Sequence, residues 1–110
     1  MEKFVKWDVV VLPFPFSDLS ASKRRPALVV ANLLGDDIIL SQITSEARKD
    51  NYAIQLTKND FKEKGLNLIS YIRPNRLFTA EKSIIAYRVG FIMKEKIKEV
   101  EKALIRIFQS

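Results

Sequence analysis

Short apolar segments, separated by turn-forming residues, occupy most of this chain, and only its last part has a helical period. The segments that read as strands are Trp7–Leu12, Ala27–Ala31, Ile38–Thr44, Tyr52–Thr57, Leu66–Ile72, Leu77–Ala80 and Ile84–Ile92. Because no crossover helix lies between them, the pattern excludes a parallel α/β fold. The sequence therefore predicts a mainly β protein of about six or seven short strands, in a small twisted sheet or partly closed barrel.

Turn signals predict how several of these segments connect. Gly35–Asp37 is a turn signal, so the strands on either side of it should form a hairpin. Residues 58–64, with Gly65 behind them, fit a single helical turn that is ended by glycine. Arg73–Arg76 contains Pro-Asn and predicts a tight turn, and Gly90 predicts a bulge in the last strand.

From Lys94 onward the hydrophobic period changes from that of strands to that of a helix. Apolar residues recur at spacings of three and four, at Ile97, Val100, Leu104, Ile107 and Phe108. Charged residues take the other positions. We expect a C-terminal amphipathic helix of about 15 residues that packs across the sheet as a lid.

The connection between the first two strands carries three consecutive cations, Lys23, Arg24 and Arg25, followed by Pro26. A proline disfavours helix in the residue before it, so Arg25 should be extended at the start of the second strand. A guanidinium fixed where a loop meets a sheet suits a phosphate-binding group. For Lys23 and Arg24, solvated loop charges remain an equal alternative.

Phe14 and Phe16 alternate with prolines just before this loop, so one face of the segment is aromatic. Packing into the core is the favoured interpretation of the pair. The alternative is a groove on which bases stack.

Two further polar clusters are candidates for a site. The third strand ends in Gln42, Thr44 and Ser45, and the predicted hairpin brings this end close to Arg25. The alternative for Thr44 is a β-forming residue that satisfies a turn. The other cluster contains Ser70, Tyr71, Arg73, Asn75 and Arg76, for which turn residues and solvated arginines are the alternative interpretation.

Composition restricts the chemistry that these clusters can perform. The 110 residues include no cysteine and no histidine, so thiol chemistry and the usual neutral-pH base are excluded. The aspartates at positions 8, 18, 36, 37 and 60 match no metal-ligand spacing, and we expect neither a metal site nor another cofactor. The net charge of +6 favours a polyanion or an acidic protein as partner.

The expected location is the cytoplasm, in one domain over residues 1–110. No apolar run approaches the roughly 20 residues that span a bilayer. The first residues carry charges at Glu2, Lys3, Lys6 and Asp8, with no signal-peptide pattern. No linker divides the chain, and its length suits a single core.

An arginine and a threonine without a histidine suit one reaction class, the metal-independent cleavage of RNA by its own 2′-hydroxyl. The nucleophile belongs to the substrate, so the protein must hold the phosphate, align the attack and neutralise the developing charge. Arg25 can supply bidentate hydrogen bonds to the phosphate, and Thr44 can donate one more. The residues do not indicate which group takes the 2′-proton.

Four blocks of the sequence resemble the MazF/PemK toxins of type II toxin–antitoxin systems. They are Val9–Asp18 (VVVLPFPFSD), Lys23–Val30 (KRRPALVV), Ser41–Ser45 (SQITS) and Ser70–Phe78 (SYIRPNRLF), and they occur in the order that the family has. The resemblance implies an SH3-like barrel of the MazF/CcdB toxin type with a C-terminal helix. It also implies a homodimer that cleaves single-stranded RNA at specific sequences and is neutralised by an acidic antitoxin.

The same resemblance implies roles for individual residues. The family's catalytic arginine falls on Arg25 and its catalytic threonine on Thr44, with Ser20, Lys23 and Gln42 among the substrate contacts. Arg24, Ser45, Tyr71 and Arg73 complete the substrate-binding residues that we expect. One departure from the family pattern is Trp7-Asp8, where many members open the first strand with Gly-Asp, and it should alter the turn before the sheet.

Two other functions stay open at this point. A non-catalytic module of the same fold could inhibit a gyrase or bind nucleic acid, because fold alone does not set activity. The second alternative is an inactive relic of a toxin that only binds an antitoxin. Metal-independent cleavage of RNA at one sequence would distinguish the enzyme from both.

Overall fold

The computed structural model describes residues 3–14, 23–46 and 50–110. Within those residues the elements are β1 (Asp8–Pro13), β2 (Arg24–Asn32), β3 (Asp37–Thr44), β4 (Ile54–Leu56), η1 (Lys58–Asp60), β5 (Phe61–Lys64), β6 (Ser70–Glu81), η2 (Lys82–Ile84), β7 (Tyr87–Ile92) and α1 (Lys94–Phe108). The strands form one antiparallel sheet in the order β4-β6-β3-β2-β1-β7-β5.

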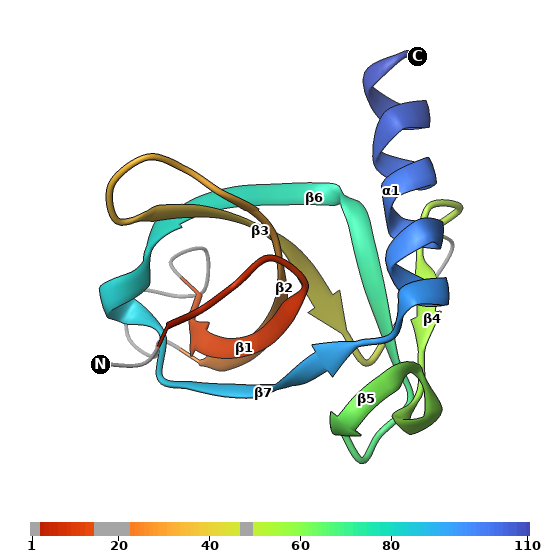
Figure 1. The fold of residues 1–110 in the computed structure, drawn as a ribbon. Helices are drawn as coiled ribbons and strands as arrows, with labels where there is room; N and C mark the ends of the chain where they lie inside the picture. Colours follow the sequence, from red (N-terminus) through yellow and green to blue (C-terminus); the bar gives the residue numbers. More distant parts are fainter. Residues whose placement is uncertain (1–2, 15–22, 47–49) are drawn as a thin grey trace.

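The sheet curls on itself into a half-barrel, with α1 at one end beside β4 (Figure 1). The two edge strands, β4 and β5, are joined through the short helix η1. This architecture confirms the predicted fold class, a mainly β, twisted and partly closed barrel with a C-terminal helix. The predicted hairpin is also confirmed, because β2 pairs with β3 across the turn at Gly35.

Both faces of the central strands are buried, which explains why their sequences are continuously apolar. In β2, Leu28 packs into one hydrophobic cluster, while Ala27 and Val29 pack into a second on the opposite face. Phe14 belongs to the second cluster and lies edge-on to Phe78, with ring centroids 5.2 Å apart. The core interpretation of Phe14 is thus confirmed, and Phe16 lies outside the described residues.

The tight turn predicted at Arg73–Arg76 is wrong, because these residues lie inside the 12-residue strand β6. The pairing of β3 with β6 shifts at this point: Ser41 pairs with Leu77, whereas the next residue, Gln42, pairs with Arg73. Residues 74–76 are therefore excess residues in a bulge, which bends the strand and accommodates a proline. Figure 1 shows the resulting bend in β6.

The predicted helical turn over residues 58–64 is correct only for its first half. A single 3₁₀ turn, η1, is followed by the edge strand β5, which pairs with β7. The chain then reverses through two left-handed residues, Lys64 at φ 58° and Gly65 at φ 123°.

The predicted strands Tyr52–Thr57 and Ile84–Ile92 are shorter in the structure, where they are β4 and β7. The β1–β7 register shift leaves Val89 as the extra residue, next to Gly90, where the bulge was predicted.

The helix α1 has the predicted length, but it does not cover the sheet as a lid. Val100 is its fully buried residue, and Ile97, Ala103 and Leu104 pack against the core in part. The last turns extend past the barrel (Figure 1), and the Phe108 side chain is 72% exposed. The apolar face of the helix is thus longer than the part of it that packs against the sheet, and its C-terminal end stays exposed.

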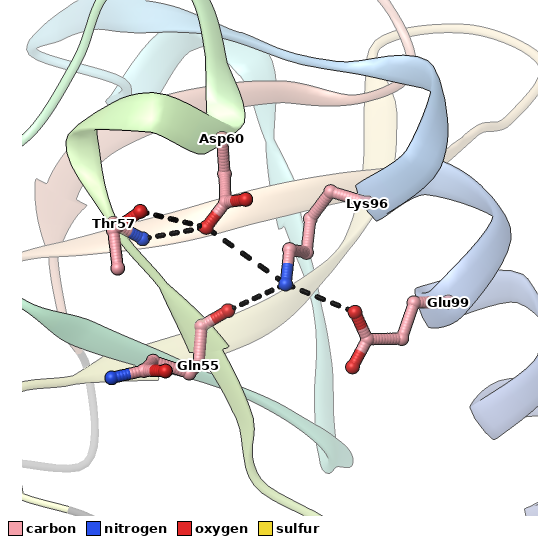
Figure 2. A network of polar contacts seen from close by, with 5 residues as sticks. All are labelled: Gln55, Thr57, Asp60, Lys96 and Glu99. Carbon is pink, nitrogen blue, oxygen red and sulfur yellow. Dashed lines mark hydrogen bonds and ion pairs between the residues drawn. The ribbon is translucent and has the colours of Figure 1, made fainter.

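A lysine at the start of α1 ties the helix to the edge strand β4. The Lys96 Nζ donates to the main-chain carbonyl of Gln55 at 2.8 Å and to Glu99 at 2.9 Å, and it lies 3.8 Å from Asp60 (Figure 2). The Asp60 carboxylate in turn accepts hydrogen bonds from the main-chain N–H and from the hydroxyl of Thr57. The network occupies a carbonyl at the sheet edge and fixes the connection from β4 to β5.

Before β1 the chain adopts an unusual backbone that a buried carboxylate supports. Trp7 has φ 78°, a conformation that favours glycine, while its side chain is buried in the core. The fully buried Asp8 accepts hydrogen bonds from the Val5 N–H and the Arg88 Nε, both at 2.8 Å. The burial of the indole offsets the backbone strain, so this turn tolerates a tryptophan.

We expect Gly65→Ala to destabilise the protein by about 2–3 kcal/mol, because a residue with a Cβ is strained in this conformation. A Cβ at this position would also lie 2.6 Å from the ring of Phe61, which is buried. Urea denaturation measures the loss. The matched control is Gly35→Ala, which has φ 81° but open space around its Cβ, so only the backbone cost remains. Equal losses in the two variants would contradict the packing argument.

Candidate active site

The start of β2 and the end of β3 meet at one end of the sheet. Ala27 pairs with Gln42, so continuing this antiparallel register by two residues brings Arg25 opposite Thr44. Directly opposite residues share a face of the sheet, with Cβ atoms about 4.5–5.5 Å apart. The two side chains that the sequence singled out therefore come from adjacent strands at the same level.

Both residues line one groove at these strand ends, which we call the strand-end groove. Its volume is about 520 Å³, and its lining residues are Arg25, Pro26, Ile43, Thr44, Ser45, Leu66, Asn67, Leu68 and Ser70. One wall comes from β2, β3 and Ser45, and the other comes from residues 66–68 and the first residue of β6. Such a volume lies within the range of about 300–1,000 Å³ that is typical of small-molecule sites.

The hydroxyl of Thr44 is oriented by its own turn. Its Oγ1 accepts a hydrogen bond of 3.1 Å from the main-chain N–H of Glu46. A hydroxyl that accepts in this way keeps its own hydrogen available for donation. Thr44 therefore stabilises a turn, which was the alternative interpretation of this residue. Its hydroxyl can still donate a hydrogen bond to a ligand. The Arg25 side chain is exposed at the start of its strand.

The structure brings together some of the predicted site residues and not others. Arg25, Thr44 and Ser45 line the strand-end groove, whereas the described residues Lys23, Arg24, Gln42, Tyr71 and Arg73 are not among its lining residues. Lys23 and Arg24 are exposed, and Ser20 lies outside the described residues. Tyr71 pairs with Thr44 across β3 and β6, and Arg73 pairs with Gln42. Gln42 on β3 and Tyr71 and Arg73 on β6 are thus neighbours of the groove residue Thr44 in the sheet.

The guanidinium of Arg73 is engaged by a carboxylate that the sequence did not single out. Its Nε lies 2.7 Å from Asp50 Oδ2, and the Asp50 side chain is only 6% exposed. Burial alone raises the pKa of this carboxyl. The hydrogen bonds from Arg73 and the Tyr52 N–H, together with the charges of Arg73 and Arg76, outweigh burial and lower the pKa below 3.8. Arg73 is thus held in place by a buried carboxylate.

The groove wall between β5 and β6 was not predicted from the sequence. Leu68 and Ile69 belong to the apolar segment that was predicted to be a strand, but they are 72% and 56% exposed. The wall is shaped by the reversal at Gly65 and by a hydrogen bond of 3.1 Å from Ser70 Oγ to the Leu68 carbonyl. Gly65 before an apolar run was the available signal, since it indicates a reversal instead of a continuous strand.

Across residues 3–14, 23–46 and 50–110, acidic side chains do not gather in a group of three that would hold a metal ion. The helices in these ranges also lack the length and apolarity that a membrane span requires.

One comparison with known proteins identifies a family. Residues 6–108 match the family model described as PemK-like, MazF-like toxin of type II toxin–antitoxin system. A search of curated proteins gives no match.

Solved structures show the same fold at low sequence identity. An endoribonuclease in complex with its cognate antitoxin, from a mycobacterial species, has a TM-score of 0.76 and 14% identity, covering 97% of this chain and 96% of that chain. A MazE–MazF complex from Deinococcus radiodurans has a TM-score of 0.74 and 17% identity, covering 94% of each chain. The toxin MazF-mt6 of Mycobacterium tuberculosis has a TM-score of 0.73 and 14% identity, covering 93% of this chain and 96% of that chain.

Asp50→Asn should destabilise the protein by about 1–2 kcal/mol at neutral pH, because the charge-assisted bond to Arg73 is lost. The pKa of Asp50 is lowered by folding, so its stabilisation is complete above the ordinary value of 3.8 and disappears as the pH falls through the lower folded value. Urea denaturation from pH 2 to 7 measures this dependence. In Asp50→Asn the free energy of unfolding should lack the part of its decrease at low pH that comes from this carboxylate. The same pH dependence of the free energy of unfolding in both proteins would contradict the assignment.

Proposed function

The chain belongs to the family of PemK-like, MazF-like toxins of type II toxin–antitoxin systems, and we propose that it is a metal-independent endoribonuclease acting on single-stranded RNA. The observation that carries the proposal is that Arg25 and Thr44 line one groove, at adjacent strand ends. An exposed guanidinium and a hydroxyl with a free hydrogen are donors for the oxygens of a phosphodiester.

In the proposed reaction the substrate attacks itself. The ribose 2′-oxygen forms a bond to phosphorus, and the bond from phosphorus to the 5′-oxygen of the next nucleotide breaks. The 2′-hydroxyl loses its proton and the departing 5′-oxygen takes one up, so the products are a cyclic phosphate and a 5′-hydroxyl, and no water enters this step. Arg25 binds the non-bridging oxygens and stabilises the extra negative charge, while Thr44 donates a further hydrogen bond that keeps the attack in line.

Residues around the groove are proposed to bind the rest of the RNA. Phosphates and bases on either side of the cut would contact Ser20, Lys23, Arg24, Gln42, Ser45, Tyr71 and Arg73. The net charge of +6 supports such binding, because each neutralised phosphate releases counterions.

The proposed partners are an acidic antitoxin and a second copy of this chain, in the cytoplasm. Solved structures with this fold include complexes of a toxin with its antitoxin. A basic toxin and an acidic antitoxin attract one another electrostatically. The uncovered apolar end of α1, where Ile105 is 57% exposed and Phe108 72%, supports a dimer.

Arg25→Ala should lower the rate of RNA cleavage by at least about 100-fold while the fold is retained, because it removes the main charge-stabilising group. The assay uses purified protein, end-labelled single-stranded RNA and EDTA, with circular dichroism to check folding. The matched control is Arg24→Ala, which removes the same charge from the adjacent residue and should mainly raise KM.

Unchanged cleavage by a folded Arg25→Ala protein would reject the catalytic assignment. If the wild-type protein arrests growth but cuts no RNA, the nuclease proposal fails and the non-catalytic binding module is favoured.

Phe108→Glu should weaken the proposed dimer, because it introduces a charge on the exposed apolar end of α1. Analytical ultracentrifugation should show the wild-type chain at twice its own mass and this variant shifted toward the monomer. The control is Glu95→Lys, which changes charge at an exposed position in the first turn of the same helix, away from Ile105 and Phe108. A wild-type protein that sediments as a monomer would contradict the proposal.

A further inference from the structure

One face of the sheet changes from apolar to polar along its length. Val29, Leu40 and Phe78 face one another in the second hydrophobic cluster, through the pairs Val29–Leu40 and Leu40–Phe78. Toward the strand-end groove the same strands pair Gln42 with Arg73, and then Thr44 with Tyr71. The face that forms the core at one end therefore carries hydrogen-bonding groups at the other.

The last row of this polar face continues beyond Tyr71 onto the edge strand. Tyr71 pairs with Gln55 of β4 as well as with Thr44 of β3. Because the continued β2–β3 register sets Arg25 opposite Thr44, the four residues form one row across four adjacent strands. Gln55 is exposed, whereas its neighbours Ile54 and Leu56 are buried on the opposite face. Strands are about 4.8 Å apart, so Gln55 lies about 10 Å from Thr44.

The backbone of Gln55 is held while its side chain is left free. Lys96 donates to the main-chain carbonyl of Gln55 at 2.8 Å, and the side-chain amide points away from Lys96 and the helix (Figure 2). Lys96 is itself bound to Glu99 and lies close to Asp60, so this part of β4 has a fixed position. A side chain on a supported strand can present its amide with defined geometry.

We infer that Tyr71 and Gln55 form a base-binding subsite next to the cleaved phosphate, in which Gln55 determines sequence specificity. This inference rests on the proposed nuclease function. The Tyr71 ring provides a surface on which a base stacks, and stacking tolerates every base. The Gln55 amide supplies one donor and one acceptor side by side, the pattern that matches the edge of adenine. Single-stranded RNA exposes these edges for reading.

The test is a cleavage experiment on a pool of randomised single-stranded RNA, in which the fragment ends are sequenced. The wild-type protein should prefer adenine at one position close to the cut. In Gln55→Ala that preference should fall by about tenfold with cleavage elsewhere retained, as expected for the loss of one bidentate contact. Gln55→Glu, whose carboxylate only accepts hydrogen bonds, should shift the preference toward cytosine.

Tyr71→Ala should reduce kcat/KM whatever the base at this position, whereas Tyr71→Phe should retain it, because stacking needs only the ring. The matched control is Gln109→Ala, an exposed glutamine at the end of α1, which should leave the sequence profile unchanged.

An unchanged profile in a Gln55→Ala protein that still cleaves RNA would overturn the inference and leave the nuclease function intact. Loss of a preference for a base other than adenine would reject the adenine assignment. Absence of RNA cleavage by the wild-type protein would instead reject the function on which the inference rests.

Discussion

The antiparallel pairing of β2 with β3 is the constraint on which the site depends. Arg25 and Thr44 are far apart in sequence, and the register Ala27–Gln42 brings them to adjacent strand ends. A slip by one residue would turn the side chains of either strand to the other face. The register is secured because both faces of these strands are buried, Leu28 on one side and Val29 on the other. The core and the site are thus fixed by the same pairing.

The bulge in β6 has a comparable effect on the substrate face. Ser41 pairs with Leu77 and Gln42 with Arg73, so residues 74–76 absorb a bend between the core part of the strand and its polar part. Beyond the bend, Arg73 is held by Asp50, and Tyr71 lies beside Thr44. The excess residues let one strand serve the core of the barrel and the row of polar side chains next to the groove.

Much of the fold was predictable because local signals and tertiary structure agree. The hairpin at Gly35 and the helix from Lys94 were predicted correctly. The errors occurred where one local pattern is compatible with two structures. Pro-Asn in Arg73–Arg76 favours a turn, yet a bulge also accommodates proline without a lost ladder bond. Residues 66–72 were predicted to be one strand, but the strand begins only at Ser70, and the reversal at Gly65 places residues 66–68 in the groove wall.

By itself the sequence determined the fold class, the extended backbone at Arg25 and the candidate pair Arg25–Thr44, because these depend on local periodicity, on Pro26 and on the hairpin turn. Only the tertiary structure decided that Asp50 holds Arg73, that residues 66–68 form the opposite wall, and that Gln55 joins the row at Tyr71. Each of these depends on pairing or packing between segments distant in sequence. Such contacts are set by register and by the curl of the sheet, which no local pattern specifies.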